Sequence, residues 1–268
     1  MHEDIGAGDI TSQALFKSPK TAQAAVIAKD GGVLAGMTVA MATFLMRDAK
    51  AKFMPLETDG RRVKAGQRIA YIEGELSAIL GAERTALNFL SRLSGIATLT
   101  SAFVEAVKPY KTKIMDTRKT APGLRLLDKY AVSIGGGTNH RIGLYDQVLI
   151  KDNHLAALNY DWDMVGSAIA SARKRKIRAE VEVQDMGQFR KALGLGPDVI
   201  MLDNMGLKEI KEAVALRDNG HFELQLEASG GVNLKNAGKI AAAGVDMISI
   251  GALTHSVKAV DYSLEIVG

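Results

Sequence analysis

Residues 113–155 read KIMDTRKTAPGLRLLDKYAVSIGGGTNHRIGLYDQVLIKDNHL. A short apolar run ends in residues 116–119 (DTRK), and a second ends in residues 151–154 (KDNH). A helical segment and the loop 135–141 (GGGTNHR) lie between them. So many cations and glycines, placed where strands end, have little structural use. The stretch therefore predicts a binding site for a substrate that carries several negative charges.

The composition is that of an ordinary globular protein of one large or two modest domains. The chain has 268 residues, of which 47% are hydrophobic and 24% charged. It contains no cysteine, which excludes disulfides and a thiolate metal site and fits a reducing compartment. The first residues lack the basic-then-apolar order of a signal peptide, and no apolar run reaches the roughly 18 residues of a membrane span. We therefore expect a cytoplasmic protein with no membrane partner.

The positive net charge is weak evidence for an anionic partner by itself. It amounts to +4, and the longest cationic run is residues 173–178 (RKRKIR). This run closes an amphipathic helix, where cations favour the negative end of the helix dipole. We therefore expect no nucleic-acid partner.

The N-terminal part predicts a β-rich framework with one helix. Strand-like segments occur at 24–29, 52–56 and 68–72, and a helical pattern occurs at 36–47. Residues 59–74 resemble the hairpin of biotinyl and lipoyl carrier domains, but the exposed lysine turn of those domains is missing. An apolar helical stripe follows from Ser77, is interrupted at Gly95, and continues as a second helix to about Val107.

Strand-like and helical segments alternate from Lys113 onward. The expected strands are 113–116, 147–150, 179–183, 198–202, 223–227 and 246–250. The expected helices are 122–132, 161–174, 186–193, 207–219 and 234–243. This alternation predicts βαβ units and a parallel sheet, either an open doubly wound sheet or a barrel. Residues 259–266 alternate again and are expected to return to the first domain.

Polar, charged or glycine residues close all six expected strands. They are Asp116 to Lys119, Lys151 to Asn153, Glu180 and Glu182, Asp203 and Asn204, Ser229 to Gly231, and Gly251 and Ala252. Active sites of barrels and open parallel sheets collect at the carboxyl ends of the strands. The six strand ends together therefore predict one shared site.

The residue types suggest roles within that site. Ser229-Gly230-Gly231 opens a helix, and with Gly251-Ala252 it would form a phosphate cup of backbone N–H groups. Glu180 and Glu182 lie two apart on a strand and so share a face. With Asp203 they suit Mg²⁺ that carries phosphates.

Simpler readings remain open for each feature. The glycines could be ordinary turns, the carboxylates could pair with a basic residue, and Arg84 could be an exposed helix cation. Lys151 has two readings, as a Schiff-base nucleophile or as a point charge on an anion.

The motifs quoted above belong to a series that runs through nearly the whole chain. The series consists of EDIGAGDITS, ERTALNFLSRLSGIAT, DTRKTAPGLRLLDKYAV, GGGTNHRIGLYDQVLIKDNH, EVEV, IMLDNM, LEASGGVN and ISIGALTHS. In this order the motifs resemble the quinolinate phosphoribosyltransferase family, also called carboxylating nicotinate-nucleotide pyrophosphorylases. One departure is at the start, where family members usually have a further helical segment ahead of EDxGxGD.

The resemblance implies an α/β fold of two domains. Residues 1–95, with a return by 258–268, would form an N-terminal α/β sandwich, and residues 96–257 would form an incomplete parallel α/β barrel. It also implies a homodimer, sometimes a higher assembly, in which the sandwich of one subunit closes over the barrel of the other. The implied reaction joins quinolinate to 5-phosphoribosyl 1-pyrophosphate with Mg²⁺, giving nicotinate mononucleotide, pyrophosphate and CO₂.

The resemblance also implies a role for each matched residue. Arg118, His140, Arg141 and Lys151 would line the quinolinate pocket, with Arg84 reaching in from the second subunit. Lys119 would lie near the pyrophosphate, while Glu180, Glu182 and Asp203 would face the ribose and the metal. The 5-phosphate would be held by Ser229, Gly230, Gly231, Gly251, Ala252 and His255.

Three other functions are weighed against this one. The first is the related protein of some molybdenum-uptake operons, which matches LIKDNH and NHRIGLYD less well. The second is a Schiff-base aldolase that uses Lys151. The third is a non-enzymatic scaffold or carrier, which the six functional strand ends disfavour.

Overall fold

The computed structural model describes residues 1–267, which form two compact units. The first contains Met1–Ser101, Tyr130–Gly136 and the residues from Ser256 onward, and the second contains Ala102–Lys129 and Gly137–His255. The division lies a few residues from the predicted boundaries, except that Tyr130–Gly136 joins the first unit. Residue 268, at the end of the predicted return, lies outside the described residues.

The first unit is built on an antiparallel sheet with the strand order β12-β1-β5-β3. Its strands are β1 (Thr21–Ala28), β3 (Lys52–Pro55), β5 (Arg68–Glu75) and β12 (Tyr262–Val267), with a separate pair, β2 (Gly32–Val33) and β4 (Arg62–Val63). Its helices are α1 (His2–Ile5), α2 (Ile10–Leu15), α3 (Met37–Arg47) and the first part of α4 (Leu76–Val107). The expected return of the chain end is confirmed, because β12 pairs with β1.

One apolar core holds the sheet and the helices of this unit together. β1 contributes Val26 and β5 contributes Ile72, while α3 contributes Phe44 and α4 contributes Leu87, all at most 2% exposed. Helices on a sheet form the predicted α/β sandwich. α1 and α2 were not predicted, since neither is long enough to show a helical repeat.

α4 corrects the prediction of two helices separated at Gly95. It is one helix from Leu76 to Val107, and Gly95 lies in its interior. A Cβ atom at Gly95 would lie 2.4 Å from the carbonyl oxygen of Lys258. The glycine is therefore needed for the close approach of another segment, not for a helix break.

The second unit contains the βαβ elements, except that the end of α5 from Tyr130 belongs to the first unit. Its strands are β6 (Lys113–Met115), β7 (Val148–Ile150), β8 (Ala179–Val183), β9 (Val199–Asp203), β10 (Gln225–Ser229) and β11 (Met247–Ser249). The helices that follow them are α5 (Arg125–Ile134), α6 (Asp152–Ala157), α7 (Trp162–Lys174), α8 (Met186–Leu195), α9 (Leu207–Asp218), α10 (Ala237–Ala241) and α11 (Ala252–His255). The short helices α6 and α11 were not predicted, and α10 is shorter than the predicted 234–243.

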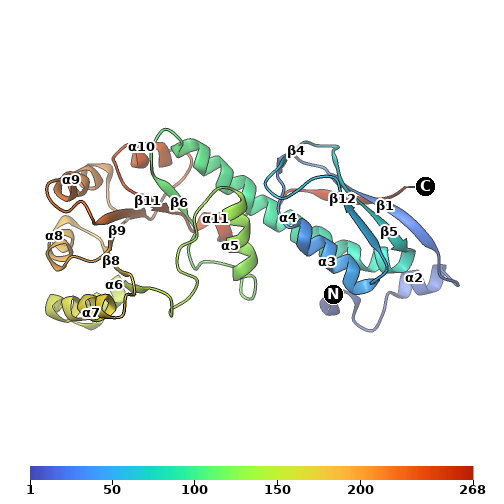
Figure 1. The fold of residues 1–268 in the computed structure, drawn as a ribbon, viewed down its shortest axis with the longest axis horizontal. Helices are drawn as coiled ribbons and strands as arrows, with labels where there is room; N and C mark the ends of the chain where they lie inside the picture. The colour runs from blue at the N-terminus through green and yellow to red at the C-terminus, as the bar shows by residue number, and fades with distance from the viewer. Residues whose placement is uncertain (268) are drawn as a thin grey trace. The chain divides into compact units, whose positions relative to one another are not determined.

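The sheet of this unit decides between a doubly wound fold and a barrel. Its order is β6-β11-β10-β9-β8-β7, and every pairing is parallel. Each strand from β7 to β10 is next to its successor, and β11 is next to β6, which is the circular order of a barrel. The circle is open between β6 and β7, so the fold is an incomplete α/β barrel. Helices α7, α8 and α9 follow one another along one side of this sheet (Figure 1).

The strand ends place polar residues where the sequence predicts them, with small shifts. β9 continues through Asp203 and β10 through Ser229, one and two residues beyond the expected ends. Since all six strands are parallel, their carboxyl ends meet at one edge of the barrel. Among residues 1–267, no helix is both long and apolar enough to cross a membrane.

Candidate active site

A cavity of about 610 Å³ lies at the carboxyl ends of the barrel strands. The sequence-predicted residues that line it are Arg118, Lys119, His140, Arg141, Lys151, Glu182, Asp203, Ser229, Gly230, Gly231, Gly251, Ala252 and His255. The two other predicted residues, Arg84 and Glu180, do not line it. The cavity also includes Thr117 and Asn204, which were predicted as strand-end residues without a role, and residues that the sequence did not single out, among them Leu149, Met201, Val232 and Ser249.

One part of the cavity is lined by glycines in left-handed conformations. Gly230 and Gly231, after β10, have φ of +87° and +60°. At Gly251 a Cβ atom would lie 2.9 Å from Cδ of Lys119 and 3.1 Å from the ring of His255. Glycine therefore lets the side chains of Lys119 and His255 approach the backbone after β11, an arrangement suited to a phosphate group.

Another part of the cavity is lined by Arg118, Arg141 and Lys151, which together form the cationic wall. Arg118 has a buried Nε that has no hydrogen-bond partner within residues 1–267. Arg141 is 9% exposed, and its Nη1 donates to the carbonyl oxygen of Gln147 at 3.1 Å. Burial, and then the nearby charge of Arg118, lower the pKa of Arg141 from its ordinary value. Two guanidinium groups close enough to repel each other favour an anion between them.

The two glutamates of β8 lie at different depths. Both point to one face of the strand, as predicted, but only Glu182 lines the cavity, where it pairs with Lys151. Glu180 is 1% exposed and accepts a hydrogen bond from Nε2 of Gln147 at 2.7 Å. Because a strand advances about 3.3 Å per residue, two residues place Glu182 at the mouth and Glu180 a layer deeper. Of the two glutamates predicted to face the metal and the ribose, Glu182 is therefore the one that lines the cavity.

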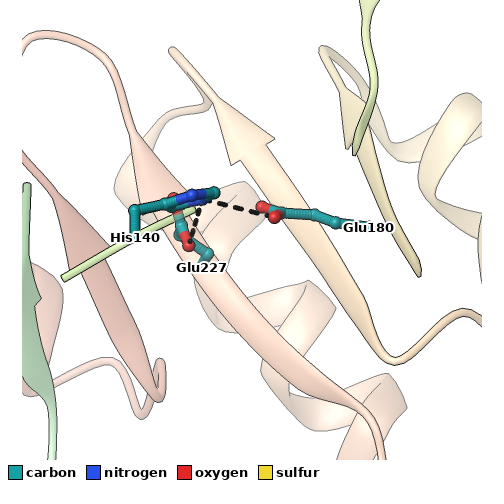
Figure 2. Close-up of side chains that lie close together, drawn as sticks. All are labelled: His140, Glu180 and Glu227. Atoms are coloured by element: carbon teal, nitrogen blue, oxygen red, sulfur yellow. Dashed lines mark ion pairs between the residues drawn. The ribbon is translucent and has the colours of Figure 1, made fainter. Parts of the chain in front are cut away.

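Glu180 belongs to a buried cluster with His140 and Glu227 (Figure 2). Nε2 of His140 lies 3.3 Å from Oε2 of Glu180 and 3.6 Å from Oε2 of Glu227. Nδ1 of the ring accepts the N–H of Arg141 at 2.7 Å, so a neutral ring carries its proton on Nε2, facing the carboxylates. A protonated nitrogen does not ligate a metal, and we interpret the cluster as a hydrogen-bonded group under the cavity.

The pKa values of this cluster reflect burial opposed by charge. For His140, burial lowers the pKa, but the hydrogen bond to Glu180 and the charges of Glu227 and Glu180 outweigh burial and raise it. For Glu227, burial and then the charge of Glu180 raise the pKa to about 7. Sequence reasoning missed Glu227, although it lies two residues before Ser229 on β10 and so shares its face.

A second buried network fixes the backbone at His140. Lys129 on α5 and Asp116 after β6 form an ion pair of 2.5 Å, with side chains 3% and 0% exposed. Asp116 also accepts the N–H of His140 at 2.8 Å, and Lys129 donates to the carbonyl oxygen of His140 at 2.8 Å. Thr138 extends alongside Met115 as an isolated parallel bridge. The loop after the triple glycine is therefore held through both the backbone and the imidazole ring of His140.

Arg84 lies on α4 in the first unit and is exposed. Its role in the site of a second subunit stays a prediction.

These features define an α/β-barrel enzyme for substrates that carry carboxylate and phosphate groups. Two family models match the chain: the quinolinate phosphoribosyl transferase N-terminal domain over residues 9–94 and the C-terminal domain over residues 96–265. The chain therefore belongs to the quinolinate phosphoribosyltransferase family.

Named relatives agree with the family. A probable nicotinate-nucleotide pyrophosphorylase (carboxylating) of Bacillus subtilis (strain 168) is 40% identical over 98% of this chain and 90% of its own length. The nicotinate-nucleotide pyrophosphorylase (carboxylating) of Mycobacterium leprae is 42% identical over 99% of this chain and 94% of its own. The crystal structure of NadC from Streptococcus pyogenes has a TM-score of 0.92 at 39% identity and covers 100% of this chain and 94% of its own.

The ion pair that holds His140 can be tested by its effect on folding. Lys129→Met should lower the free energy of unfolding by about 3–5 kcal/mol, because it leaves the carboxylate of Asp116 buried without its partner. Urea unfolding of the variant and the wild type measures the difference.

Lys108→Met is the matched control. Its pair with Glu105, at 3.2 Å, is 71% and 56% exposed, so its loss should cost less than about 1 kcal/mol. Equal losses in the two variants would contradict a special role for the buried pair.

Proposed function

We propose that the chain transfers the phosphoribosyl group of 5-phosphoribosyl 1-pyrophosphate to quinolinate and releases CO₂. The products are nicotinate mononucleotide and pyrophosphate, so the enzyme acts in NAD biosynthesis. The observation that supports this most is the composition of the cavity. It combines a cationic wall, in which the buried Nε of Arg118 has no hydrogen-bond partner among residues 1–267, with two carboxylates and with glycines in left-handed backbone conformations.

The cationic wall suits the quinolinate dicarboxylate. Arg118, Arg141 and Lys151 face one cavity, and guanidinium groups bind carboxylates through paired hydrogen bonds. The lone pair of the pyridine nitrogen attacks C1 of the ribose directly, so no general base is needed. The reaction therefore depends on orientation and on exclusion of water rather than on a nucleophilic side chain.

The carboxylates and Lys119 suit the charges that develop during transfer. As the bond to pyrophosphate breaks, C1 gains positive charge, which Glu182 and Asp203 can stabilise, while Lys119 balances the leaving group. The pyridine nitrogen then carries the ribose and a positive charge. That charge stabilises the electron pair left at C2 when CO₂ departs, and a proton replaces the carboxylate.

Mg²⁺ is the cofactor that these donors fit. Glu182 and Asp203 present hard oxygen ligands in the same cavity as the glycine loops, and Mg²⁺ is commonly held by one or two carboxylates together with substrate phosphates. When bound, the ion would supply Lewis-acid neutralisation of the pyrophosphate charge.

The Schiff-base alternative is disfavoured by the pairing of Lys151. Its amine is engaged by Glu182, and an ammonium held by a carboxylate is a poor nucleophile. No observation favours the molybdenum-operon relative. The cytoplasmic location stays a prediction from the sequence.

A product assay tests the proposed activity. Incubation with quinolinate, 5-phosphoribosyl 1-pyrophosphate and Mg²⁺ should yield nicotinate mononucleotide and CO₂, detected by chromatography and by release of label from the 2-carboxylate. Nicotinate in place of quinolinate is the contrast substrate, because it lacks the second carboxylate for the cationic wall. Turnover of nicotinate but not quinolinate would overturn the proposal.

We further propose a homodimer in which Arg84 completes the site of the second subunit. Its exposure on α4 supports this proposal. Arg84→Ala and Arg118→Ala should each be nearly inactive, but mixing the two after dissociation should restore activity, because one site of a mixed dimer has both arginines.

Arg118→Ala mixed with Lys151→Ala is the control pair. Both residues belong to the same cavity of one chain, so no mixed dimer contains an intact site. Failure of the first mixture to recover, or equal recovery by both mixtures, would reject the shared site.

A further inference from the structure

Asn204 follows β9 in a backbone conformation that is uncommon for a residue with a side chain. Its φ is +55°, in the left-handed region. The other non-glycine residues with positive φ in the described chain are Asn159, Tyr160 and Lys176, and none of them lines the cavity. Asparagine tolerates this region better than most residues, because its short polar side chain forms local hydrogen bonds. The position therefore combines an unusual backbone with a place in the active-site cavity.

The side chain of Asn204 contacts two parts of the cavity. Its Nδ2 donates to Oδ2 of Asp203 at 2.8 Å. On its other side the carboxamide occupies the space beside Gly230, where a Cβ atom would lie 2.1 Å from Oδ1 of Asn204. The main-chain N–H of Asn204 donates to the carbonyl oxygen of Ser229 at 2.9 Å, which joins the ends of β9 and β10. Asn204 thus lies between the carboxylate and the phosphate-binding glycines.

We propose that Asn204 is a positioning residue that orients the carboxylate of Asp203 toward a divalent cation and seats the loop of Gly230 beside it. This inference rests on the proposed function, since it assigns Asp203 to the metal and ribose. The amide engages one carboxylate oxygen and leaves Oδ1 of Asp203 for an external ligand. The left-handed backbone turns the chain sharply after Asp203, so that the amide folds back onto the carboxylate of the preceding residue.

The substitution Asn204→Gly distinguishes the contribution of the side chain from that of the left-handed backbone. Glycine adopts the left-handed region without steric strain, so the turn and its hydrogen bond to Ser229 are kept while the amide is lost. Asn159→Gly is the matched control, because Asn159 has φ of +50° and lies outside the cavity. Thermal unfolding should be similar for the two variants and the wild type.

The substitution Asn204→Gly should change the KM of one substrate and not that of the other. Because a hydrogen bond to a charged group is lost, the KM for 5-phosphoribosyl 1-pyrophosphate should rise about tenfold or more in Asn204→Gly. The KM for quinolinate should change little, because the cationic wall is untouched. Binding of Mn²⁺ alone, followed by water proton relaxation, should weaken by a similar factor in Asn204→Gly and not in Asn159→Gly.

Several results would overturn the inference. They are wild-type KM and Mn²⁺ affinity in Asn204→Gly, equal changes in both substrates, equal changes in the Asn159→Gly control, and a wild type that binds no Mn²⁺. Failure of the proposed function would look different: the wild type would make no nicotinate mononucleotide, while the Mn²⁺ comparison between the two glycine variants would still decide the role of Asn204.

Discussion

Asp116 and Lys129 meet in a part of the second unit where neither side chain is open to solvent. Burying either charge alone would be expensive, and the pair is tolerable only because each partner satisfies the other and both bind the backbone of His140. These hydrogen bonds hold the backbone of the triple-glycine loop in place at His140. The ring of His140, held from below by Glu180 and Glu227, and the guanidinium of Arg141 then face the cavity from a rigid base.

Charge in the barrel is arranged in layers. The cavity is lined by Arg118, Lys119, Arg141 and Lys151, and the layer beneath holds Glu180 and Glu227. A cationic pocket of this density would repel itself, and buried carboxylates below it offset part of that repulsion without competing for the substrate. Glu182, which pairs with Lys151, and Asp203 remain at the mouth of the cavity.

The sequence predicted those elements that local residue patterns determine, namely the strands with polar ends and most of the long helices. The family motifs then placed most cavity residues at the correct strand ends. The errors occur where a distant contact decides. Gly95 was predicted to interrupt a helix because its partner, the backbone of Lys258, lies far away in sequence. Glu180 and Glu182 share a face, but their depths follow from the strand direction within the barrel. Glu227 was overlooked because its partner His140 comes from a loop far away in sequence. Asn204 was predicted only as part of a strand end, because its place beside Gly230 depends on the loop after β10.

Transfer to quinolinate requires the cationic wall to bind the two carboxylates of the substrate. Steady-state kinetics of Arg118→Ala and Arg141→Ala, with quinolinate varied, measure this binding, and Arg173→Ala is a control because its Nη2 donates to Gly196 at the surface. Each cavity variant should lose several kcal/mol of transition-state binding, a fall in kcat/KM of roughly a hundredfold or more, while the control stays unchanged. Near-wild-type kinetics in both cavity variants would contradict the account.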